Sequence, residues 1–282
     1  MHPARIAELL QPFVGVPAAI SSAPCHSEPA QAGEEPAVLS PAQLQYISTY
    51  IDILLRWNAR INLTAIRDPE EIVTRHFGES LFASRHLFPK EAHVGYRGRA
   101  ALQGRVTRTE EIGALAPGVI TLADLGSGAG FPGVPIKLWA PHISLTLIES
   151  NQKKVAFLRE IVRALTLTNV NVFSGRAEHL LGGPHTNHTH PKRDHNLDRQ
   201  TSRKTEDQPP RGFDLVTLRA VERFANVLPV AASLVAPGGR LALLIGTSQL
   251  AQVQTTLAGI SWEPAQAVPI SQSRTLLVGR LS

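Results

Sequence analysis

The sequence has little cysteine, few aromatic residues and no long apolar run. Among 282 residues there is one cysteine, Cys25, and aromatic residues make up 5%. A single cysteine excludes an internal disulfide and any cysteine-rich metal site. No apolar run approaches the roughly 18 residues that a membrane-spanning helix needs. The first 25 residues contain one Lys or Arg, Arg5, so a secretory signal is not expected either. We expect a cytoplasmic protein without membrane or metal partners.

What is present is the composition of a globular protein with a basic surplus. Hydrophobic residues are 43% and charged residues 18%, which disfavours a wholly disordered chain, a coiled coil or a fibrous repeat. The net charge of +5 suits an acidic partner such as nucleic acid. Much of this surplus lies in two segments that look inserted, 92–118 and 184–211. The charge total is therefore weak support for RNA binding.

The first part of the chain predicts a tail followed by helices. Residues 1–39 are interpreted as a disordered or weakly ordered tail, because 16–40 are rich in Pro, Ala, Ser and Glu. Residues 40–91 form a predicted helical extension. Ser40, Pro41 and Gln43 resemble a capping box that opens a helix running to about Trp57. A second helix is expected to start at Asp68.

From residue 119 the pattern changes to short apolar runs that alternate with helical stretches, which is typical of a parallel sheet built from βαβ units. One of the helices is expected over 151–166, and a Pro-Gly-Gly at 237–239 is read as a helix stop before a strand. The segments 92–118 and 184–211 are interpreted as an insertion loop and a flexible insertion. The predicted strands are 119–125, 143–149, 169–173, 213–218, 240–245 and 274–280.

The densest chemical signal is a glycine-rich loop directly after the first predicted strand. It reads DLGSGAGFPG from Asp124 to Gly133. Glycines let a backbone turn tightly and approach a ligand closely, and open α/β sheets bind cofactors at the carboxyl ends of their strands. The loop therefore predicts a cofactor site.

Two cofactors compete for this loop. Gly128, Gly130 and Gly133 fit the GxGxxG dinucleotide pattern, which alone is a weak match. Prolines inside and just after the loop disfavour a dinucleotide, since they would disturb the helix start that receives a pyrophosphate. S-adenosylmethionine has no pyrophosphate, and its positive sulfonium and ammonium suit the acid at Asp124.

Further candidate residues follow the other strands. Glu149 ends the second strand, where its carboxylate can accept hydrogen bonds from both ribose hydroxyls of either cofactor. Ala177 and Glu178 follow the third strand, where they can meet an adenine; a plain acid at a helix N-terminus is the alternative for Glu178. Arg219 follows the fourth strand and is expected at the same sheet edge, with a solvated loop arginine as the alternative.

With these residues assembled, the chain resembles the RsmG (glucose-inhibited division protein B) family of bacterial 16S ribosomal RNA guanine-N7 methyltransferases. The resemblance covers roughly 40–90, 119–181 and 212–282. The motifs that carry it are Trp57-Asn58, Asn62-Leu63-Thr64, Arg67-Asp68-Pro69, Arg75-His76 with Ser80, the loop DLGSGAGFPGVP, Arg176-Ala177-Glu178 and Leu218-Arg219-Ala220.

The resemblance implies an α/β fold with a doubly wound, mainly parallel sheet over 119–282, of the Rossmann-like class I methyltransferase type, behind the helical N-terminal extension. It implies S-adenosylmethionine as the cofactor and 16S rRNA or the small ribosomal subunit as the partner. The sequence departs from the family at Ile245, where Lys is common, at Glu79, where Asp is usual, and in both insertions. The positions that match the family's cofactor contacts are Gly126, Phe131, Ala177, Glu178 and Arg219, to which the loop argument adds Asp124, Gly128 and Glu149.

The implied chemistry needs little machinery. Guanine N7 carries an unprotonated lone pair, so no proton has to be removed before attack, and we assign no catalytic residue. The Asn-Pro-Pro-aromatic loop that accompanies amino-group methylation is absent after the fourth strand. The cysteine that C5 methylation of cytosine requires is present only as Cys25, in the predicted tail.

RNA contacts are expected from basic residues near the strand ends. Each of them has a solvated surface charge as its alternative, and His76 has that of a core histidine. Trp57 is interpreted as core packing. The four histidines at 185, 188, 190 and 195 are attributed to a flexible insertion rather than to a metal site. The predicted RNA-contacting residues are Arg67, Arg75, His76, Lys153 and Lys154, with Arg219 beside them.

Three other functions remain open at this point: an S-adenosylmethionine methyltransferase with another substrate, a NAD(P)-binding oxidoreductase, and a non-catalytic RNA-binding module that keeps only the fold. The first differs from the main hypothesis in its substrate, the second in its cofactor, and the third in having no activity.

Overall fold

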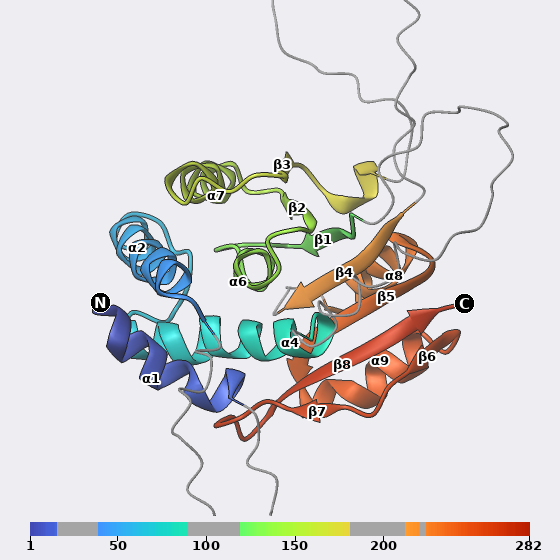
Figure 1. The fold of residues 1–282 in the computed structure, drawn as a ribbon. Coiled ribbons are helices and arrows are strands. Elements are labelled where there is room, and N and C mark those ends of the chain that lie inside the picture. Colours follow the sequence, from blue (N-terminus) through green and yellow to red (C-terminus); the bar gives the residue numbers. More distant parts are fainter. Residues whose placement is uncertain (16–38, 90–118, 181–211, 220–223) are drawn as a thin grey trace, which may run out of the picture.

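A computed structural model describes residues 1–15, 39–89, 119–180, 212–219 and 224–282. The expected insertions 92–118 and 184–211 lie wholly outside these residues. The described part is built around one sheet (Figure 1). The strand order is β3-β2-β1-β4-β5-β8-β6, and β7 pairs with β8. The strands are β1 Thr121–Leu125, β2 Ser144–Glu149, β3 Val170–Ser174, β4 Phe213–Arg219, β5 Val235–Gly246, β6 Ile260–Trp262, β7 Gln266–Ala267 and β8 Arg274–Leu281.

Strands β1 to β5 pair in parallel, and β8 runs antiparallel to β5, β6 and β7. This confirms the predicted α/β fold with a mainly parallel, doubly wound sheet. The short strands β6 and β7 were not expected. The predicted strand 240–245 also starts earlier, at Val235, so Gly238 and Gly239 lie inside β5 and do not cap a helix. Gly238 has φ +74°, and the β4–β5 register shifts between Phe213 and Leu215.

Helices cover both faces of the sheet because successive strand residues point to opposite sides. In β1, Leu122 joins a core with α6, α7 and the N-terminal helices α1 (Pro3–Val14), α2 (Pro41–Asn58) and α4 (Glu79–Leu87). Its neighbour Ala123 joins a second core with α8 and α9. The elements of the first face that follow β1 are α6 Gly133–Trp139 and α7 Gln152–Ala164, close to the predicted helix 151–166. Those of the second face are α8 Phe224–Ser233 and α9 Leu250–Thr256, with the short 3₁₀ turns η2 Ala177–Leu180 and η3 Thr247–Gln249.

The N-terminal extension folds largely as predicted. Helix α2, Pro41–Asn58, begins with the expected capping box: the Gln43 amide donates to Ser40 Oγ at 3.2 Å, and the Ser40 amide donates to Gln43 Oε1 at 2.8 Å. Asp68 caps α3, Pro69–Glu71, by accepting from the Glu71 amide at 2.9 Å. The chain then continues as a π-helix, η1 Ile72–Gly78, and as α4 Glu79–Leu87.

The prediction of a weakly ordered tail over 1–39 is wrong for its first part. Pro3–Val14 form helix α1, which buries Ile6, Leu10, Phe13 and Val14. These residues repeat at helical spacing, and the composition of the following segment hid that pattern. Residues 16–38 of the expected tail lie outside the described part.

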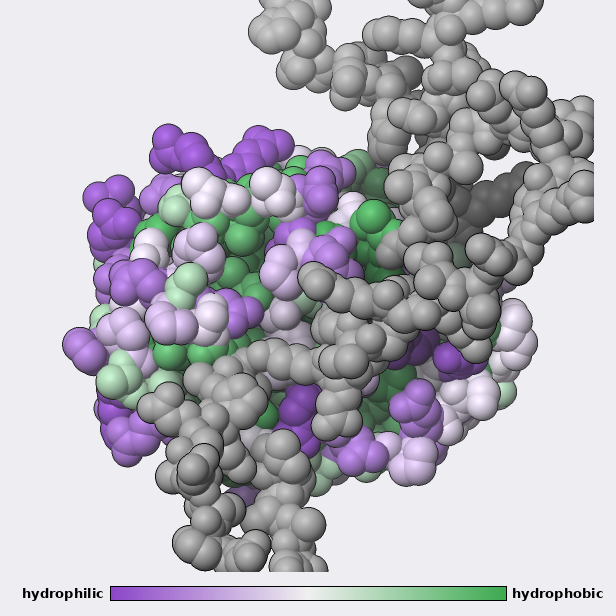
Figure 2. Space-filling view, viewed as in Figure 1, coloured by the Kyte–Doolittle hydropathy of each residue, from purple (hydrophilic) through white to green (hydrophobic). Residues whose placement is uncertain are grey.

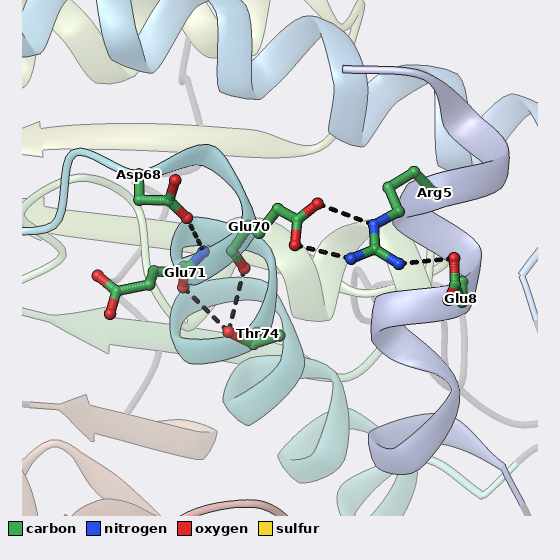
Figure 3. A network of polar contacts seen from close by, with 6 residues as sticks. All are labelled: Arg5, Glu8, Asp68, Glu70, Glu71 and Thr74. Carbon is green, nitrogen blue, oxygen red and sulfur yellow. Dashed lines mark hydrogen bonds and ion pairs between the residues drawn. The ribbon is translucent and has the colours of Figure 1, made fainter.

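Helix α1 packs on the segment around the π-helix η1, which carries Arg75 and His76. Arg5 donates from Nε and Nη2 to the two carboxylate oxygens of Glu70, both at 2.8 Å, and its Nη1 lies 2.7 Å from Glu8 (Figure 3). These groups are exposed, so the contact orients α1 more than it stabilises it. Beneath it, the ring of Phe13 lies so close to Gly78 that a Cβ there would come within 2.6 Å of the ring.

Candidate functional site

The candidate site lies where the sheet order reverses, at the carboxyl ends of β1 and β4. From β1 the chain moves outward to β2 and β3, and then returns to the other side of β1 with β4. In open α/β sheets such a reversal opens a crevice between two strand ends, and ligands bind there. The glycine loop follows β1, and Arg219 ends β4.

The glycine loop has a backbone that few other residues could adopt. Gly126, Gly128 and Gly130 have φ values of +68°, +56° and +83°. A Cβ on Gly130 would lie 2.5 Å from the hydroxyl of Tyr50, which donates a hydrogen bond to the carbonyl of Ala129. Helix α2, which holds Tyr50, therefore fixes the loop from outside the sheet.

One argument from the sequence fails here. Pro132 and Pro135 were expected to disturb a helix start, but α6 begins at Gly133 with Pro132 as its N-cap and Pro135 in its first turn. First-turn positions tolerate proline because their amides have no partner within the helix. The prolines therefore do not discriminate between the two cofactors.

Asp124 lies beneath the loop and lines neither of the hollows described below. Its side chain is fully buried; Oδ2 accepts from the Gly133 amide at 3.2 Å and Oδ1 from the Thr217 hydroxyl at 2.8 Å. Burial raises the pKa of this carboxyl to about 6, against the lowering effect of those hydrogen bonds. The expectation that Asp124 directly faces a positive cofactor is not met, since in this structure it holds the loop in place.

Two hollows meet at Gly126. The Arg219 hollow, about 330 Å³, lies between the loop, the η1 segment and the start of β8. The Glu149 hollow, about 550 Å³, lies beyond the ends of β2 and β3 against α8. Of the predicted residues, Gly126, Gly128, Phe131, Arg219, Arg75, His76 and Lys154 line the Arg219 hollow, while Gly126, Glu149, Ala177 and Glu178 line the Glu149 hollow.

Glu149 is 8% exposed and is held by backbone amides. Its Oε2 accepts from Gly128 at 3.0 Å, and its Oε1 accepts from Asn151 at 2.7 Å. A carboxylate has about four acceptor positions, so each oxygen keeps capacity for a further donor. The carboxylate is thus fixed at the rim of its hollow and remains able to accept from a ligand.

Arg219 is buried rather than solvated. Its Nη2 donates to the carbonyl of Arg75 at 2.6 Å and to Glu79 Oε2 at 2.9 Å. The side chain of Arg219 is 8% exposed and that of Glu79 is 4% exposed. Burial lowers its pKa, which the charge of Glu79 opposes. The guanidinium carbon lies 6.0 Å from the ring centre of Phe131, and Nε is buried without a partner among the described residues. This overturns the solvated-loop alternative.

His76 is half-buried beside Phe131 and Thr64. Its ring stacks on Phe131 with centroids 4.8 Å apart and planes 22° apart, and Nε2 lies 2.7 Å from Thr64 Oγ1. Burial, followed by the charges of nearby arginines, lowers its pKa to about 3. The imidazole is therefore neutral at neutral pH and brings no positive charge to a phosphate, while it lines the Arg219 hollow.

The remaining predicted cations divide into two groups. Arg75 and Lys154 line the Arg219 hollow, whereas Arg67 and Lys153 are exposed and line neither hollow. Trp57 packs as expected, edge-on to Phe157 with ring centres 5.8 Å apart.

Arg274 is a site residue that the sequence reasoning missed. It begins β8 and lies opposite Gly246 in the antiparallel pair with β5. Because β8 runs against the other strands, its first residue lies at their carboxyl edge. The antiparallel direction of the last strand was the signal that could have found it. Ile245, which stands at the family's lysine position, is 2% exposed in the core against α8 and α9.

Within the described residues, no group of three or more His, Cys, Asp or Glu side chains is arranged to hold a metal ion. The four histidines of 184–211 are not among them. In that same part of the chain, no helix has the length and apolarity needed to cross a membrane.

Comparison with known proteins identifies the family of the chain. The profile of the GidB family, described as rRNA small subunit methyltransferase G, matches residues 43–95 and 112–275. Two relatives bear the name Ribosomal RNA small subunit methyltransferase G. The one from Stenotrophomonas maltophilia (strain R551-3) is 33% identical over 83% of this chain and 81% of its own. The one from Xanthomonas campestris pv. campestris (strain 8004) is 30% identical over 78% and 76%.

Solved structures are more distant. A predicted O-methyltransferase from Agrobacterium tumefaciens overlaps 57% of this chain and 73% of its own, with a TM-score of 0.41 and 19% identity. This likeness is too low to bear on function, and the fold class rests on the sheet order given above. The extent of the family match and the identity of the relatives are sufficient: the chain belongs to the rRNA small subunit methyltransferase G family.

Proposed function

We propose that the protein transfers a methyl group from S-adenosylmethionine to N7 of a guanine in small-subunit ribosomal RNA. Family membership supports methylation of this RNA. The observation that carries the proposal is the pair of hollows that meet at Gly126, beyond the ends of β1 and β4. The Glu149 hollow accommodates the adenosine, and the Arg219 hollow accommodates the methyl group and the guanine that receives it. The two hollows are joined at Gly126, which has no side chain.

The residues at this junction fit S-adenosylmethionine. Glu149 can accept from the ribose hydroxyls, and the wall formed by Ala177 and Glu178 can meet the adenine. Gly126 and Gly128 leave room for the cofactor to pass into the Arg219 hollow, where the unpartnered Arg219 Nε suits its carboxylate. When bound, the cofactor supplies an electrophilic methyl group on a positive sulfonium.

The chain's own residues then orient the guanine. The N7 lone pair attacks directly, so no side chain has to take a proton first. The stacked pair of His76 and Phe131 forms a flat apolar wall, and neutral His76 adds no positive charge next to the sulfonium. Arg75 and Lys154 lie at the same hollow and can bind RNA phosphates. Catalysis by positioning needs no more than this.

The test supplies radiolabelled S-adenosylmethionine with naked 16S rRNA, with small subunits and with total tRNA. N7-methylguanosine is then located by borohydride reduction and aniline cleavage. We expect label at one guanine of the 16S rRNA, in the naked RNA or in the subunit. Label confined to tRNA, or no label in any RNA, would overturn the proposal.

Cofactor binding is tested separately by calorimetric titration. We expect S-adenosylhomocysteine to bind and NADH not to bind. Replacing Gly126 by a bulky residue should abolish binding, because the side chain would close the junction between the hollows. Unchanged affinity in that variant would remove Gly126 from the cofactor site.

A further inference from the structure

A strained turn stands beside the Arg219 hollow. Val268–Ser271 form a turn between β7 and β8 in which the Ser271 amide donates to the Val268 carbonyl at 3.2 Å. Pro269 occupies the second position and Ile270 the third, with φ +61°. A turn with Pro second and a positive φ third normally has Gly or Asn there, because a side chain branched at Cβ is crowded in this conformation.

Packing does not explain the isoleucine. Its side chain is 72% exposed, whereas Tyr46 and Val119, the other large apolar residues exposed in the described part, reach 36% and 49%. Ile270 therefore combines an unfavourable backbone with an apolar surface left in water. Strained residues persist only where the surrounding structure holds them, and they cluster at functional positions.

The turn is rigidly held, so Ile270 is displayed in a fixed place. The Val268 amide donates to the Arg274 carbonyl at 3.0 Å, and the Arg274 amide donates to Ser271 Oγ at 3.1 Å. The Thr247 amide donates to the Ser273 carbonyl at 2.8 Å, which ties the segment to the end of β5. Val268 itself is 2% exposed.

The position of the turn links it to the proposed substrate. Pro269 and Ile270 line a hollow of about 380 Å³ together with Thr74 and Arg75. Arg75 also lines the Arg219 hollow, and Arg274, four residues after Ile270, lines it as well. Ile270 thus lines a hollow that adjoins the Arg219 hollow at Arg75.

A guanine that is stacked in an RNA helix would have to leave the stack to react there. The major groove of an RNA helix, where N7 lies, is too deep and narrow for side chains to reach, and enzymes that modify a base commonly extrude it. Extrusion leaves a gap in the stack, and proteins fill such gaps with apolar side chains. We propose that Ile270 is an apolar wedge that packs against the bases next to the target guanine and stabilises its extruded state. This proposal rests on the proposed function.

The experiment replaces Ile270 by Gly and by Asn, with Val119→Gly as the matched control. Val119 is also exposed but precedes β1, at the opposite end of that strand from the glycine loop. We expect Ile270→Gly to raise the thermal unfolding midpoint, to leave the affinity for S-adenosylhomocysteine unchanged and to lower kcat/KM for the RNA about tenfold. A gain in stability combined with a loss of activity separates a wedge from a merely structural role.

A binding readout distinguishes RNA from protein as the partner. The probe is a deproteinised hairpin with 2-aminopurine beside the target guanine. Its fluorescence should rise when the wild type binds, because the 2-aminopurine unstacks, and should stay low with Ile270→Gly. An equal rise in fluorescence with both proteins would overturn the wedge. So would a kcat/KM of Ile270→Gly within about twofold of the wild-type value, on the RNA that the wild type methylates. A loss confined to subunit methylation, with normal brightening, would assign Ile270 to a ribosomal protein instead. Failure of the wild type on every RNA would refute the proposed function itself.

Discussion

Burial sets the charge state of the polar residues around the glycine loop. Arg219 keeps Glu79 as an ion-pair partner inside the protein, at 2.9 Å. Among the described residues His76 has no acidic partner, and it faces arginines, which together with burial hold it neutral. Asp124 is buried too, but amide and hydroxyl donors reach its carboxylate. Three titratable residues within one site thus respond to pH in different ways.

Stability should fall on acidification because of His76. Its ordinary pKa is 6.5 and its folded value about 3, so the unfolded state binds a proton that the folded state refuses over this range. The free energy of unfolding then decreases as the pH falls from about 6.5 to about 3, and His76→Gln should flatten this dependence. Urea unfolding at a series of pH values measures it.

Asp124 acts in the opposite sense within part of that range. Its ordinary pKa is 3.8 and its folded value about 6, so the folded state binds the extra proton as the pH falls from about 6 to 3.8. Comparing the wild type with His76→Gln at each pH cancels this contribution. A difference between the two proteins that does not change with pH would contradict the predicted burial of a neutral histidine.

The pair of Glu79 and Arg219 should be sensitive to loss of one partner. Glu79→Ala leaves a buried guanidinium without its counter-charge, which typically costs about 3 to 5 kcal/mol of unfolding free energy. Chemical denaturation measures it. The control is Glu70→Ala, which removes an exposed partner of Arg5 and should have little effect on stability. Equal losses in the two variants would contradict the buried pair.

Among the elements, α1 braces the π-helix that carries Arg75 and His76. Gly78 has no room for a side chain because the ring of Phe13 occupies the place of its Cβ. Gly78→Ala should therefore destabilise the protein, and Phe13→Ala should cost about 3 to 5 kcal/mol through the cavity it leaves.

The two changes should not be additive. Phe13→Ala removes the ring that Gly78→Ala would meet, so the second substitution should cost less in the first variant than in the wild type. Denaturation of the two single variants, the double variant and the wild type gives the coupling free energy. Strict additivity would mean that α1 does not pack on the π-helix as described.

The elements that the sequence predicted are those with local signals. The capping box of α2 and the six longer strands follow from residues close in the chain. Helix α1 was missed because its neighbourhood is rich in proline and alanine, and the π-helix has no spacing that differs from an ordinary helix. Arg274 was missed because only the long-range pairing of β8 brings it to the site. The burial of Asp124 and His76 likewise depends on distant elements.

For the whole molecule, family membership decides between the hypotheses that the sequence left open. It confirms the predicted family and the methyltransferase activity, and it argues against an oxidoreductase. The glycine loop alone could not do this, since its prolines are compatible with a helix start. The space-filling view in Figure 2 also shows hydrophilic residues over the outer side of α7, whose buried residues are Val155, Phe157, Leu158 and Ile161.

Salt dependence reports which charges bind RNA. Each phosphate contact adds about one to the slope of log affinity against log salt, so Arg75→Gln should lower that slope by about one. His76→Gln should leave the slope unchanged, because the imidazole is neutral. Filter binding to the 16S rRNA over a range of salt concentrations measures both variants. A slope that falls with His76→Gln would show a charged histidine in the complex.

The place of β8 in the sheet bears on how the protein is made. β8 is the last of the described strands along the chain, yet it lies between β5 and β6 rather than at an edge. During synthesis the glycine loop and Arg219 leave the ribosome well before Arg274 does. Until β8 has emerged, one side of β5 is unpaired. The basic hollow is therefore completed only when the final strand has emerged and inserted. A nascent chain of this protein is thus unable to engage RNA through the finished site until β8 has emerged and paired with β5.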